Sequence, residues 1–436
     1  MHAMTPPLVP DSVDAIVVGT GPGGASVARE LARAGVRVLL LEQGGAAPLA
    51  GTLAQMAAMA AVPGRAAFVH RDASLLVGGA TLGGSSALNF ATAAAPPPGY
   101  FEAYGIDLAP ALAALRAELP LAPLPDALVG PMATRMMAAA RAEGVDWRKL
   151  DKMIRPALCR SSCWRCVYGC PFGAKWSARD FVDAAQEHGA LLAPNSRVTR
   201  VLVEHGRAAG VELRRAGRAR TVRAPLVVLC GGGIGSPRIL HASGLAPRHA
   251  PFFSDPVVAV IGAVDDEIDG GGAEVPMAAG WHDADAGIAL ADLTLPRPMY
   301  QAFASQVGRV DRLFAHRRAL TMMVKIRDEI GGRVGPRWAD KRLTDGDRAR
   351  LRSGVEMARA ILARAGAKKV FQTWHFAAHP GGSVRIGAGV DADLRGAVEG
   401  LYVCDASVIP RPWGLPPTLT LLALGMRLGR HLARRG

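Results

Sequence analysis

The apolar residues near the start of the chain follow a pattern that predicts a strand, a helix and a second strand. The apolar run Ala15–Val18 is followed by a glycine-rich turn and then by Val27 and Leu31 at helical spacing. Gly35 marks the expected end of the helix, and Val36–Leu41, which is apolar except for Arg37, is expected to be a second buried strand. Two buried strands joined by a helix form a βαβ unit, which predicts a parallel sheet.

Further elements are predicted along the rest of the chain. The apolar run Leu226–Cys230 precedes a glycine turn and a helix that we expect to open near Pro237, since proline suits the first turn of a helix. Residues 197–224 alternate apolar and polar positions and predict an antiparallel meander. A charged amphipathic helix is expected over 345–365, and a final helix from about Thr418.

Composition limits the possible classes of protein. A chain of 436 residues, half of them apolar and a fifth charged, is typical of a globular protein with two domains. The first twelve residues lack the features of a signal peptide, and no apolar run is long enough for a transmembrane segment. We therefore expect a cytoplasmic protein, which would lie at a membrane surface only if a partner protein brought it there.

The formal net charge of +14 does not by itself indicate nucleic-acid binding. The basic residues are mostly arginines scattered along the chain, without aromatic residues between them, and we attribute them to composition. An acidic electron-transfer partner or an anionic membrane surface would also be compatible with this charge.

The turn after the first strand has the composition of a dinucleotide-binding loop. It follows the pattern G-x-G-x-x-G in Gly19, Thr20, Gly21, Pro22, Gly23 and Gly24. Glycines at these positions let backbone N–H groups approach a pyrophosphate at the start of the helix. Glu42, at the end of the second strand, is placed to accept ribose hydroxyls. The motif predicts a bound dinucleotide without distinguishing NAD from FAD.

A loop of small residues over Val77–Phe90 favours FAD. Its residues Gly83, Gly84, Ser85 and Ser86 allow a flat ring to lie against the backbone, and Asn89 supplies an amide near that ring.

These motifs, with others downstream, resemble the glucose–methanol–choline (GMC) family of FAD-dependent oxidoreductases. The matching stretches are "GTGPGG" with Glu42, "LGGSSALN", "GSPRILHASGL", "HPGGSVRIG", "GLYVCDASVIP" and "PPTLTLLAL". The resemblance implies an α/β fold (α+β overall): a Rossmann-like FAD-binding domain with a parallel sheet and a β-meander, and an inserted substrate domain with a mainly antiparallel sheet. The expected divisions are an FAD domain over 11–100, 185–250 and 380–436, a cysteine-rich loop and lid over 101–184, and a substrate domain over 251–379.

The resemblance also assigns roles to individual residues. Val198 would hold the adenine, Asp405 and Ala406 would approach the ribityl-pyrophosphate, and His379 would be the active-site base. The glycine turn at Gly231 belongs to the same expected cofactor site. At the start of the last helix, Pro417 and Thr418 would direct free N–H groups and the positive end of the helix dipole at the flavin.

One position departs from the family pattern. The family has a second polar residue, asparagine or histidine, shortly before the last helix, and this chain has Pro416 there. A proline side chain neither donates nor accepts a hydrogen bond. Either another group assists His379, or the chemistry differs from ordinary alcohol oxidation.

Four of the six cysteines, Cys159, Cys163, Cys166 and Cys170, lie within twelve residues. The end of this run, C-x₂-C-x₃-C-P, has the spacing of bacterial ferredoxins and predicts an iron–sulfur cluster, with Cys159 the least certain ligand. The surrounding stretch is similar to the catalytic subunits of bacterial FAD-dependent sugar dehydrogenases, which carry a cluster. It is also similar to long-chain alcohol oxidases, whose cysteines need no metal. Inert or redox-active thiols and a zinc site are the alternatives.

The leading hypothesis is an FAD-dependent dehydrogenase that oxidises the hydroxyl of an alcohol, polyol or sugar, with His379 as base. Electrons would leave through the cluster to an acceptor protein or a quinone. A cluster-free alcohol oxidase that uses oxygen, and a non-redox flavin-binding lyase, are the alternatives.

Overall fold

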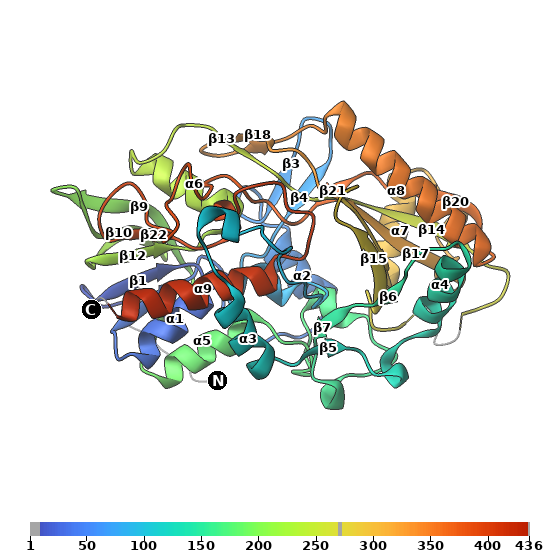
Figure 1. The fold of residues 1–436 in the computed structure, drawn as a ribbon, viewed down its shortest axis with the longest axis horizontal. Helices are drawn as coiled ribbons and strands as arrows, with labels where there is room; N and C mark the ends of the chain where they lie inside the picture. The colour runs from blue at the N-terminus through green and yellow to red at the C-terminus, as the bar shows by residue number, and fades with distance from the viewer. Residues whose placement is uncertain (1–8, 269–272, 435–436) are drawn as a thin grey trace.

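The computed structural model describes residues 9–268 and 273–434. Most of the first twelve residues, for which no signal peptide is expected, lie outside these ranges. Figure 1 shows two lobes side by side, each built on a sheet, with the chain passing between them several times. The mixture of a parallel sheet and antiparallel sheets is the fold class that the sequence predicted.

The first lobe contains a five-stranded sheet in which every neighbouring pair of strands is parallel. Its order is β22 (Leu401–Val403), β12 (Leu226–Leu229), β1 (Ala15–Val18), β2 (Val38–Leu41) and β8 (Leu191–Ala193). Helix α1 (Pro22–Arg33) connects β1 to β2, so the predicted βαβ unit is confirmed. The strands β1 and β2 are fully buried apolar runs, as is usual when both faces of a sheet are covered, whereas β8 at the edge is partly exposed.

Helices cover one face of this sheet and a meander covers the other (Figure 1). On the helical side, α1 contacts α5 (Ala178–Glu187) and α9 (Thr418–Ala433), and α3 (Ala109–Glu118) contacts α9. The predicted antiparallel meander is confirmed as β9 (Ser196–Glu204), β10 (Arg207–Arg215) and β11 (Arg218–Arg223). The first and last helices lie close together because α9 presents glycine to α1: a Cβ at Gly425 would lie 2.5 Å from the carbonyl oxygen of Gly23.

Helix α6 (Gly232–Ala242) begins earlier than the sequence predicted. The expected start near Pro237 was wrong, because Pro237 lies inside the helix. Proline cannot donate to the carbonyl four residues before it, which belongs to Gly233. The hydroxyl of Ser383 donates to that oxygen instead, at 2.6 Å, so a contact from a distant segment compensates for the missing bond.

The second lobe contains a nine-stranded, mostly antiparallel sheet. Its strands are β3 (Ala67–Val69), β4 (Leu75–Val77), β21 (Phe376–Ala377), β14 (Pro256–Ala263), β17 (Ala319–Ile326), β16 (Ile288–Asp292), β15 (Ala279–Asp283) and β6 (Arg148–Lys149), with β20 (Lys368–Gln372) paired to β14. Two small sheets lie beside it, formed by β13 (Ala250–Phe252), β18 (Gly331–Val334) and β19 (Ala339–Asp340), and by β5 (Leu121–Pro123) and β7 (Asp151–Met153). The remaining helices are α2 (Leu53–Ala60), α4 (Pro131–Ala142), α7 (Arg297–Gln306) and α8 (Asp345–Arg364).

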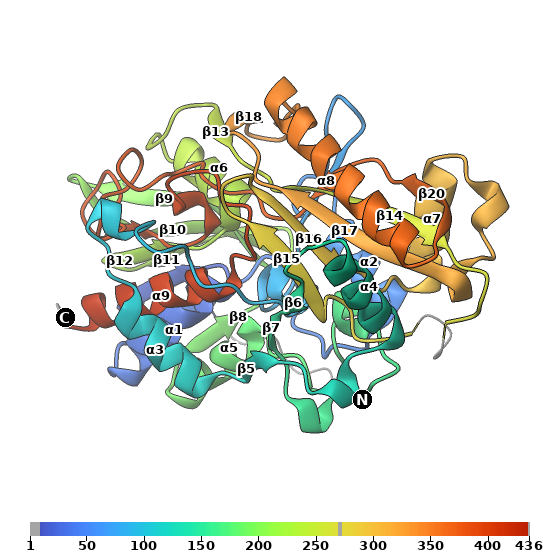
Figure 2. The same cartoon turned by 45° about the vertical axis from the view of Figure 1, so that its right-hand side comes forward.

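The two faces of the nine-stranded sheet have different partners. Alternate residues of β17, such as Met322 and Val324, pack with α4 and α8 on the outer face. Met323, between them, packs with α7 on the inner face. Figure 2 shows α8 and α4 lying along the outer side of this sheet. The predicted amphipathic helix is therefore confirmed as α8, whose first turn is closed by a capping box between Thr344 and Asp347.

The expected division into domains stays a prediction, and the sheets cross its boundaries. β3 and β4 come from the expected FAD segment, and β6 comes from the expected lid, yet all three pair within the nine-stranded sheet. No helix in the described part of the chain is both long and apolar enough to cross a lipid bilayer.

Candidate active site

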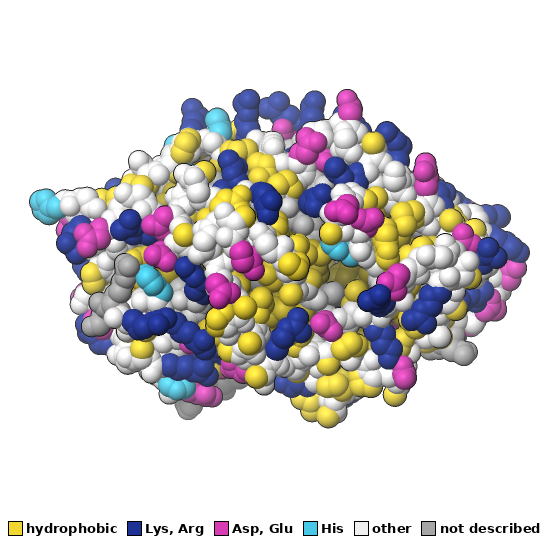
Figure 3. All heavy atoms as spheres, viewed as in Figure 1, with side chains coloured by type: hydrophobic (Ala, Val, Ile, Leu, Met, Phe, Trp, Pro, Cys, Tyr) yellow, Lys and Arg dark blue, Asp and Glu magenta, His cyan; other side chains and the backbone are white. Residues whose placement is uncertain are grey.

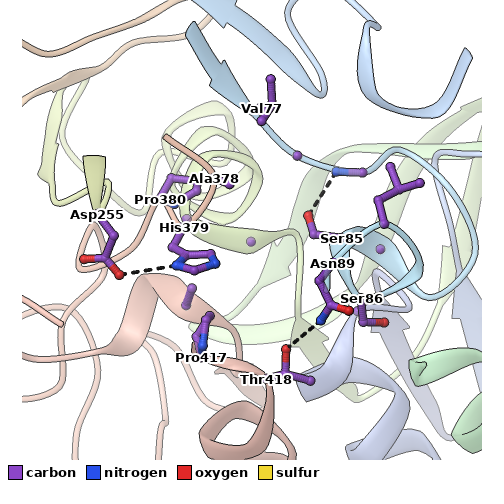
Figure 4. A pocket seen from close by; sticks show the side chains of 18 of the residues that line it. Val77, Ser85, Ser86, Asn89, Asp255, Ala378, His379, Pro380, Pro417 and Thr418 are labelled. Carbon is purple, nitrogen blue, oxygen red and sulfur yellow. Dashed lines mark hydrogen bonds and ion pairs between the residues drawn. The ribbon is translucent and has the colours of Figure 1, made fainter. Parts of the chain in front are cut away.

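A cavity of about 1140 Å³ runs between the two lobes. One end lies at the glycine turn before α1, and the other is bounded by the inner face of the nine-stranded sheet. Figure 3 shows the surface hollowed near the middle of the molecule, where hydrophobic side chains gather. Figure 4 shows the region where the two lobes meet in this cavity.

The glycine turn leaves room along the start of α1. Gly21 is the N-cap of this helix, and a Cβ placed there would have no neighbour within 4 Å. At Gly23, by contrast, a Cβ would lie 2.0 Å from the carbonyl oxygen of Cys404, so this glycine is required for packing. The turn therefore combines an open anion-binding end of a helix with close contact between strands and helix.

The predicted cofactor residues mostly line this one cavity. Fourteen of them do so: Gly19, Gly21, Pro22, Gly23, Glu42, Gly84, Ser85, Asn89, Val198, Gly231, Asp405, Ala406, Pro417 and Thr418. Gly24 and Gly83 do not line it. A Cβ at Gly24 would meet the carbonyl oxygen of Gly19 at 2.1 Å, and Gly83 has a φ of +82° in the turn before a 3₁₀ segment. These two glycines shape the chain around the cavity.

Two buried carboxylates border the cofactor end of the cavity. Glu42 accepts hydrogen bonds from the Thr20 hydroxyl at 2.7 Å and the Gly44 N–H at 2.8 Å. Asp405 accepts from the Ser236 hydroxyl at 2.5 Å and the Gly232 N–H at 2.8 Å. Burial raises the pKa of both carboxyl groups, and these hydrogen bonds oppose that effect.

Asn89 joins the small-residue loop to the start of α9. Its amide donates to the Thr418 hydroxyl at 3.3 Å, and its side-chain oxygen accepts from the Ala91 N–H at 3.0 Å. Figure 4 shows Asn89 and Thr418 facing each other across the cavity from His379. Because α9 begins at Thr418, the N–H groups of its first turn lack partners within the helix and are available at this end of the cavity.

His379 lies on the opposite wall and is paired with an aspartate. Its Nδ1 is 3.4 Å from Oδ2 of Asp255, and neither atom makes a closer polar contact within the described residues. The other oxygen of Asp255 accepts from the Gly414 N–H at 2.8 Å, which fixes the carboxylate. In Figure 4 the second ring nitrogen of His379 points away from Asp255, toward the loop that carries Ser85 and Asn89.

The surroundings favour a neutral imidazole at His379. Burial lowers its pKa, the charge of Lys325 lowers it further, and Asp255 opposes both effects. A neutral ring that donates from Nδ1 to Asp255 keeps the lone pair of Nε2 free to accept a proton.

Two comparisons with known proteins concern the family. The family model for the N-terminal part of GMC oxidoreductases matches residues 14–263, and the model for their C-terminal part matches residues 333–425. The chain belongs to the GMC oxidoreductase family. It is thus an enzyme of a group of FAD-dependent oxidoreductases, and the cavity of this GMC protein has the cofactor-sized groove that such an enzyme needs.

Several relatives are similar over nearly the whole chain. An uncharacterized GMC-type oxidoreductase of Mycobacterium tuberculosis is 29% identical, and the match covers 95% of this chain and 74% of the relative. A long-chain-alcohol oxidase of Arabidopsis thaliana is 23% identical over 96% of this chain and 66% of its own length. Among solved structures, pyridoxine 4-oxidase from Mesorbium loti superposes with a TM-score of 0.75 at 19% identity, covering 96% of this chain and 99% of that one. This last likeness confirms the fold.

The groove of this GMC protein fits FAD. Its floor is the open N-cap at Gly21, and its walls pass from Glu42 to the start of α9 at Thr418. The assignments of Val198 to the adenine and of Ala406 to the ribityl-pyrophosphate stay predictions, although both residues line the groove. Pro416 also lines the cavity, and its side chain carries no hydrogen-bonding group.

The iron–sulfur prediction is not supported. Cys159, Cys163, Cys166 and Cys170 do line one small cavity, but its volume is about 10 Å³, room for a single water molecule. Among the described residues, no group of three or more His, Cys, Asp or Glu side chains is placed to hold a metal ion. Burial raises the pKa of Cys163 and Cys166, and raises that of Cys159 to about 11, so burial disfavours the thiolate form at these three positions.

A lysine, rather than a metal, connects the cysteine loop to the cofactor end of the cavity. The buried ammonium of Lys175 shares its three N–H donors among four backbone carbonyls, those of Ser86, Ala87, Asn89 and Cys166. The first three belong to the small-residue loop and the fourth to the cysteine loop. Lys175 therefore holds these two loops together.

Two residues of the site were missed from the sequence, Asp255 and Lys325. Asp255 has a positive φ of +51° and is fully buried, but nothing in the pattern around it signals a partner for His379. Lys325 did give a signal, since it interrupts the otherwise apolar strand "ALTMMVKI" at a position that faces the cavity.

Proposed function

We propose that this protein oxidises a CH–OH group of a small-molecule substrate, with His379 as the base. The observation that carries the proposal is the His379–Asp255 pair, set in the wall of a cavity that continues into the FAD groove. When bound, FAD supplies the acceptor for a hydride from the substrate carbon. The similarity to a long-chain-alcohol oxidase supports an alcohol as the substrate class.

Asp255 sets the state of the histidine in this proposal. Its carboxylate accepts the Nδ1 proton of His379, which leaves Nε2 unprotonated and directed into the cavity. Nε2 then takes the proton of the substrate hydroxyl, and the imidazolium that forms is stabilised by the buried carboxylate. The hydrogen bond from Gly414 keeps that carboxylate from turning away.

The walls of the cavity favour an organic substrate with an apolar body. The inner face of the nine-stranded sheet and α7 contribute Val257, Leu293, Met299, Phe303 and Met323. Such walls exclude water from the site, which strengthens the interactions of the few polar groups present.

The experiment is anaerobic mixing of the FAD-loaded enzyme with alcohols, followed by absorption at the flavin band. We expect bleaching with an alcohol substrate in the wild type and a rate lower by about 10²–10⁴-fold in His379→Ala. His375→Ala is a matched control, because His375 lines the same cavity but pairs with Asp72 at 3.5 Å, away from Asp255. A His379→Ala variant that bleaches at the wild-type rate would exclude the role. Flavin that no alcohol bleaches would favour the non-redox alternative.

A further inference from the structure

Four lysines are buried in the described part of the chain: Lys152, Lys175, Lys325 and Lys341. Three of them have several acceptors each. Lys152 and Lys175 donate to backbone carbonyls, and Lys341 donates to carbonyls and pairs with Asp328 at 3.0 Å. Lys325 is only 3% exposed, yet the described residues give its ammonium neither a hydrogen bond nor an ion pair within 4 Å. It differs from the other three in lining the large cavity.

The strand register places Lys325 in a row of residues that cross the inner face of the sheet. His282 of β15 is paired with Ala289 of β16, Ala289 with Lys325 of β17, and Lys325 with Val257 of β14. All four line the cavity. The small side chain of Ala289 therefore separates two nitrogen-bearing side chains, and it leaves space over the sheet between them.

The charged neighbours of this row are already occupied. Asp255 uses its two oxygens on Gly414 and His379. On the other side, the carboxylate of Asp283 accepts from two N–H groups of its own turn, and the guanidinium of Arg327 donates to the carbonyls of Ala284 and Asp285. Asp255 acts on Lys325 only through its charge, so a group that accepts a hydrogen bond from the buried ammonium has to come from the contents of the cavity.

We propose that Lys325, together with His282, binds an anionic group of the substrate, a carboxylate, while the substrate hydroxyl lies at His379. The substrate class is then an alcohol that carries an acid group. This inference rests on the proposed function for the role of the hydroxyl, but the binding of the anion stands on its own. An unpaired buried ammonium is strongly unfavourable, and a carboxylate that accepts from it compensates for the desolvation of both charges.

The lysine is charged at neutral pH in this arrangement. Burial lowers its pKa to about 8, and Asp255 opposes the shift. His282 is exposed to solvent, yet desolvation and the charges of Lys325 and Arg327 lower its pKa while Asp283 opposes them, so its imidazole is mostly neutral at that pH. At pH 7 the site therefore offers one ammonium and one imidazole, and it loses its charge as the pH rises above 8.

The test is a titration of the FAD-loaded enzyme, followed by perturbation of the flavin spectrum, with two matched pairs of unreactive probes. These are 4-methylbenzoate with 4-methylbenzamide, and octanoate with octanamide. We expect the wild type to bind at least one acid about 10–100-fold more tightly than its amide at pH 7, and to lose this preference above pH 8. Lys325→Met should abolish the preference, and His282→Gln should reduce it. Lys368→Met is the control, because this exposed lysine pairs with Asp265 on the surface.

The outcomes separate this inference from the proposed function. A wild type that binds none of the four probes, or that binds acid and amide equally in every pair that it does bind, overturns the inference. So does a Lys325→Met variant that keeps the preference. Preference for the acid in an enzyme whose flavin is reduced by no alcohol, with or without an acid group, would leave the anion site standing and refute the proposed oxidation. The Lys325→Met variant can also be compared with the wild type in flavin reduction by 4-(hydroxymethyl)benzoate and by 4-(hydroxymethyl)benzamide. If the substitution slows both reactions equally, the lysine acts at the reacting hydroxyl instead, and the inference is overturned.

Discussion

Replacing Asp255 with asparagine should disable the base at His379 without changing the shape of the site. Asparagine has the size of aspartate and tolerates the positive φ of +51° at this position. Its side-chain oxygen can still accept from the Gly414 N–H, as Asp255 does now. The amide nitrogen then faces Nδ1 of His379, and because an amide nitrogen only donates, the ring is forced to carry its proton on Nε2. That tautomer cannot accept the substrate proton.

The size of the effect follows from the pair itself. Once His379 has taken the substrate proton, its imidazolium and the Asp255 carboxylate are two unit charges 3.4 Å apart. At an effective dielectric constant of about 20, such charges attract each other by about 5 kcal/mol. The carboxylate is fully buried and the imidazole is 28% exposed, so solvent screens the pair only in part. We expect the reduction of the flavin by substrate to slow by about 10²–10⁴-fold, which corresponds to about 3–5 kcal/mol in the barrier.

The pH dependence gives a second readout. The pKa of His379 is lowered, so the wild type should lose its base only when the pH falls below the ordinary histidine range. Asp255 is the group that raises this pKa, and its removal should move the acid limb to still lower pH. The variant should therefore show a lower plateau and an acid limb shifted down, and raising the pH should not restore its rate.

The assay is stopped-flow reduction of the FAD-loaded enzyme under anaerobic conditions between pH 5 and pH 9. Asp72→Asn is the matched control, because Asp72 makes a pair of similar length, 3.5 Å, with His375, which lines the same cavity. Flavin content and thermal unfolding would confirm that both variants are folded and loaded. An Asp255→Asn enzyme within about threefold of the wild type, with an unmoved acid limb, would refute the argument that this carboxylate orients the base.

Three further predictions concern the cofactor groove and the cysteine loop. Gly21→Glu should give a folded protein without the absorption of bound flavin, since the new side chain extends into open space at the N-cap of α1; a yellow variant would show that the pyrophosphate lies elsewhere. The cysteine cavity has a volume of about 10 Å³, so protein purified without oxygen should contain no stoichiometric iron. For the same reason the Cys166→Ser variant should have its flavin reduced by substrate at the wild-type rate. Iron and acid-labile sulfide in the purified protein would contradict this prediction. Lys175→Met should lower the free energy of unfolding in urea by about 2–4 kcal/mol, since it leaves four carbonyls without their donor; an unchanged midpoint would mean that the two loops are held by other contacts.

The sequence predicted those parts of the fold that depend on local pattern. The strands at Ala15–Val18 and Leu226–Leu229, the meander and helix α8 all follow from apolar spacing, turns and caps. The start of α6 was misplaced because Pro237 is tolerated inside the helix only through the hydroxyl of Ser383, which is 146 positions away. A contact of that kind leaves no trace in the local pattern.

The candidate site shows the same division. The glycine turn and Glu42 have fixed spacings and were found, since their chemistry depends on one short segment. Asp255 reaches His379 from a distant strand end, and Lys325 reaches the cavity only through the register of the sheet. The cysteine spacing suggested a cluster because spacing says nothing about the room that folding leaves between the thiols.

The contact between α1 and α9 has a consequence for how the enzyme is made in the cell. The parallel sheet is complete only with β22, and helix α1 packs against helix α9, which ends at Ala433. Glycines in the contact between α1 and α9 allow the two backbones to approach closely. The N-terminal half of the groove is therefore translated long before the segment that completes it, and contacts so distant in sequence form slowly. We expect the emerging chain to depend on chaperones, and flavin uptake to begin only after the ribosome has released residues 401–433.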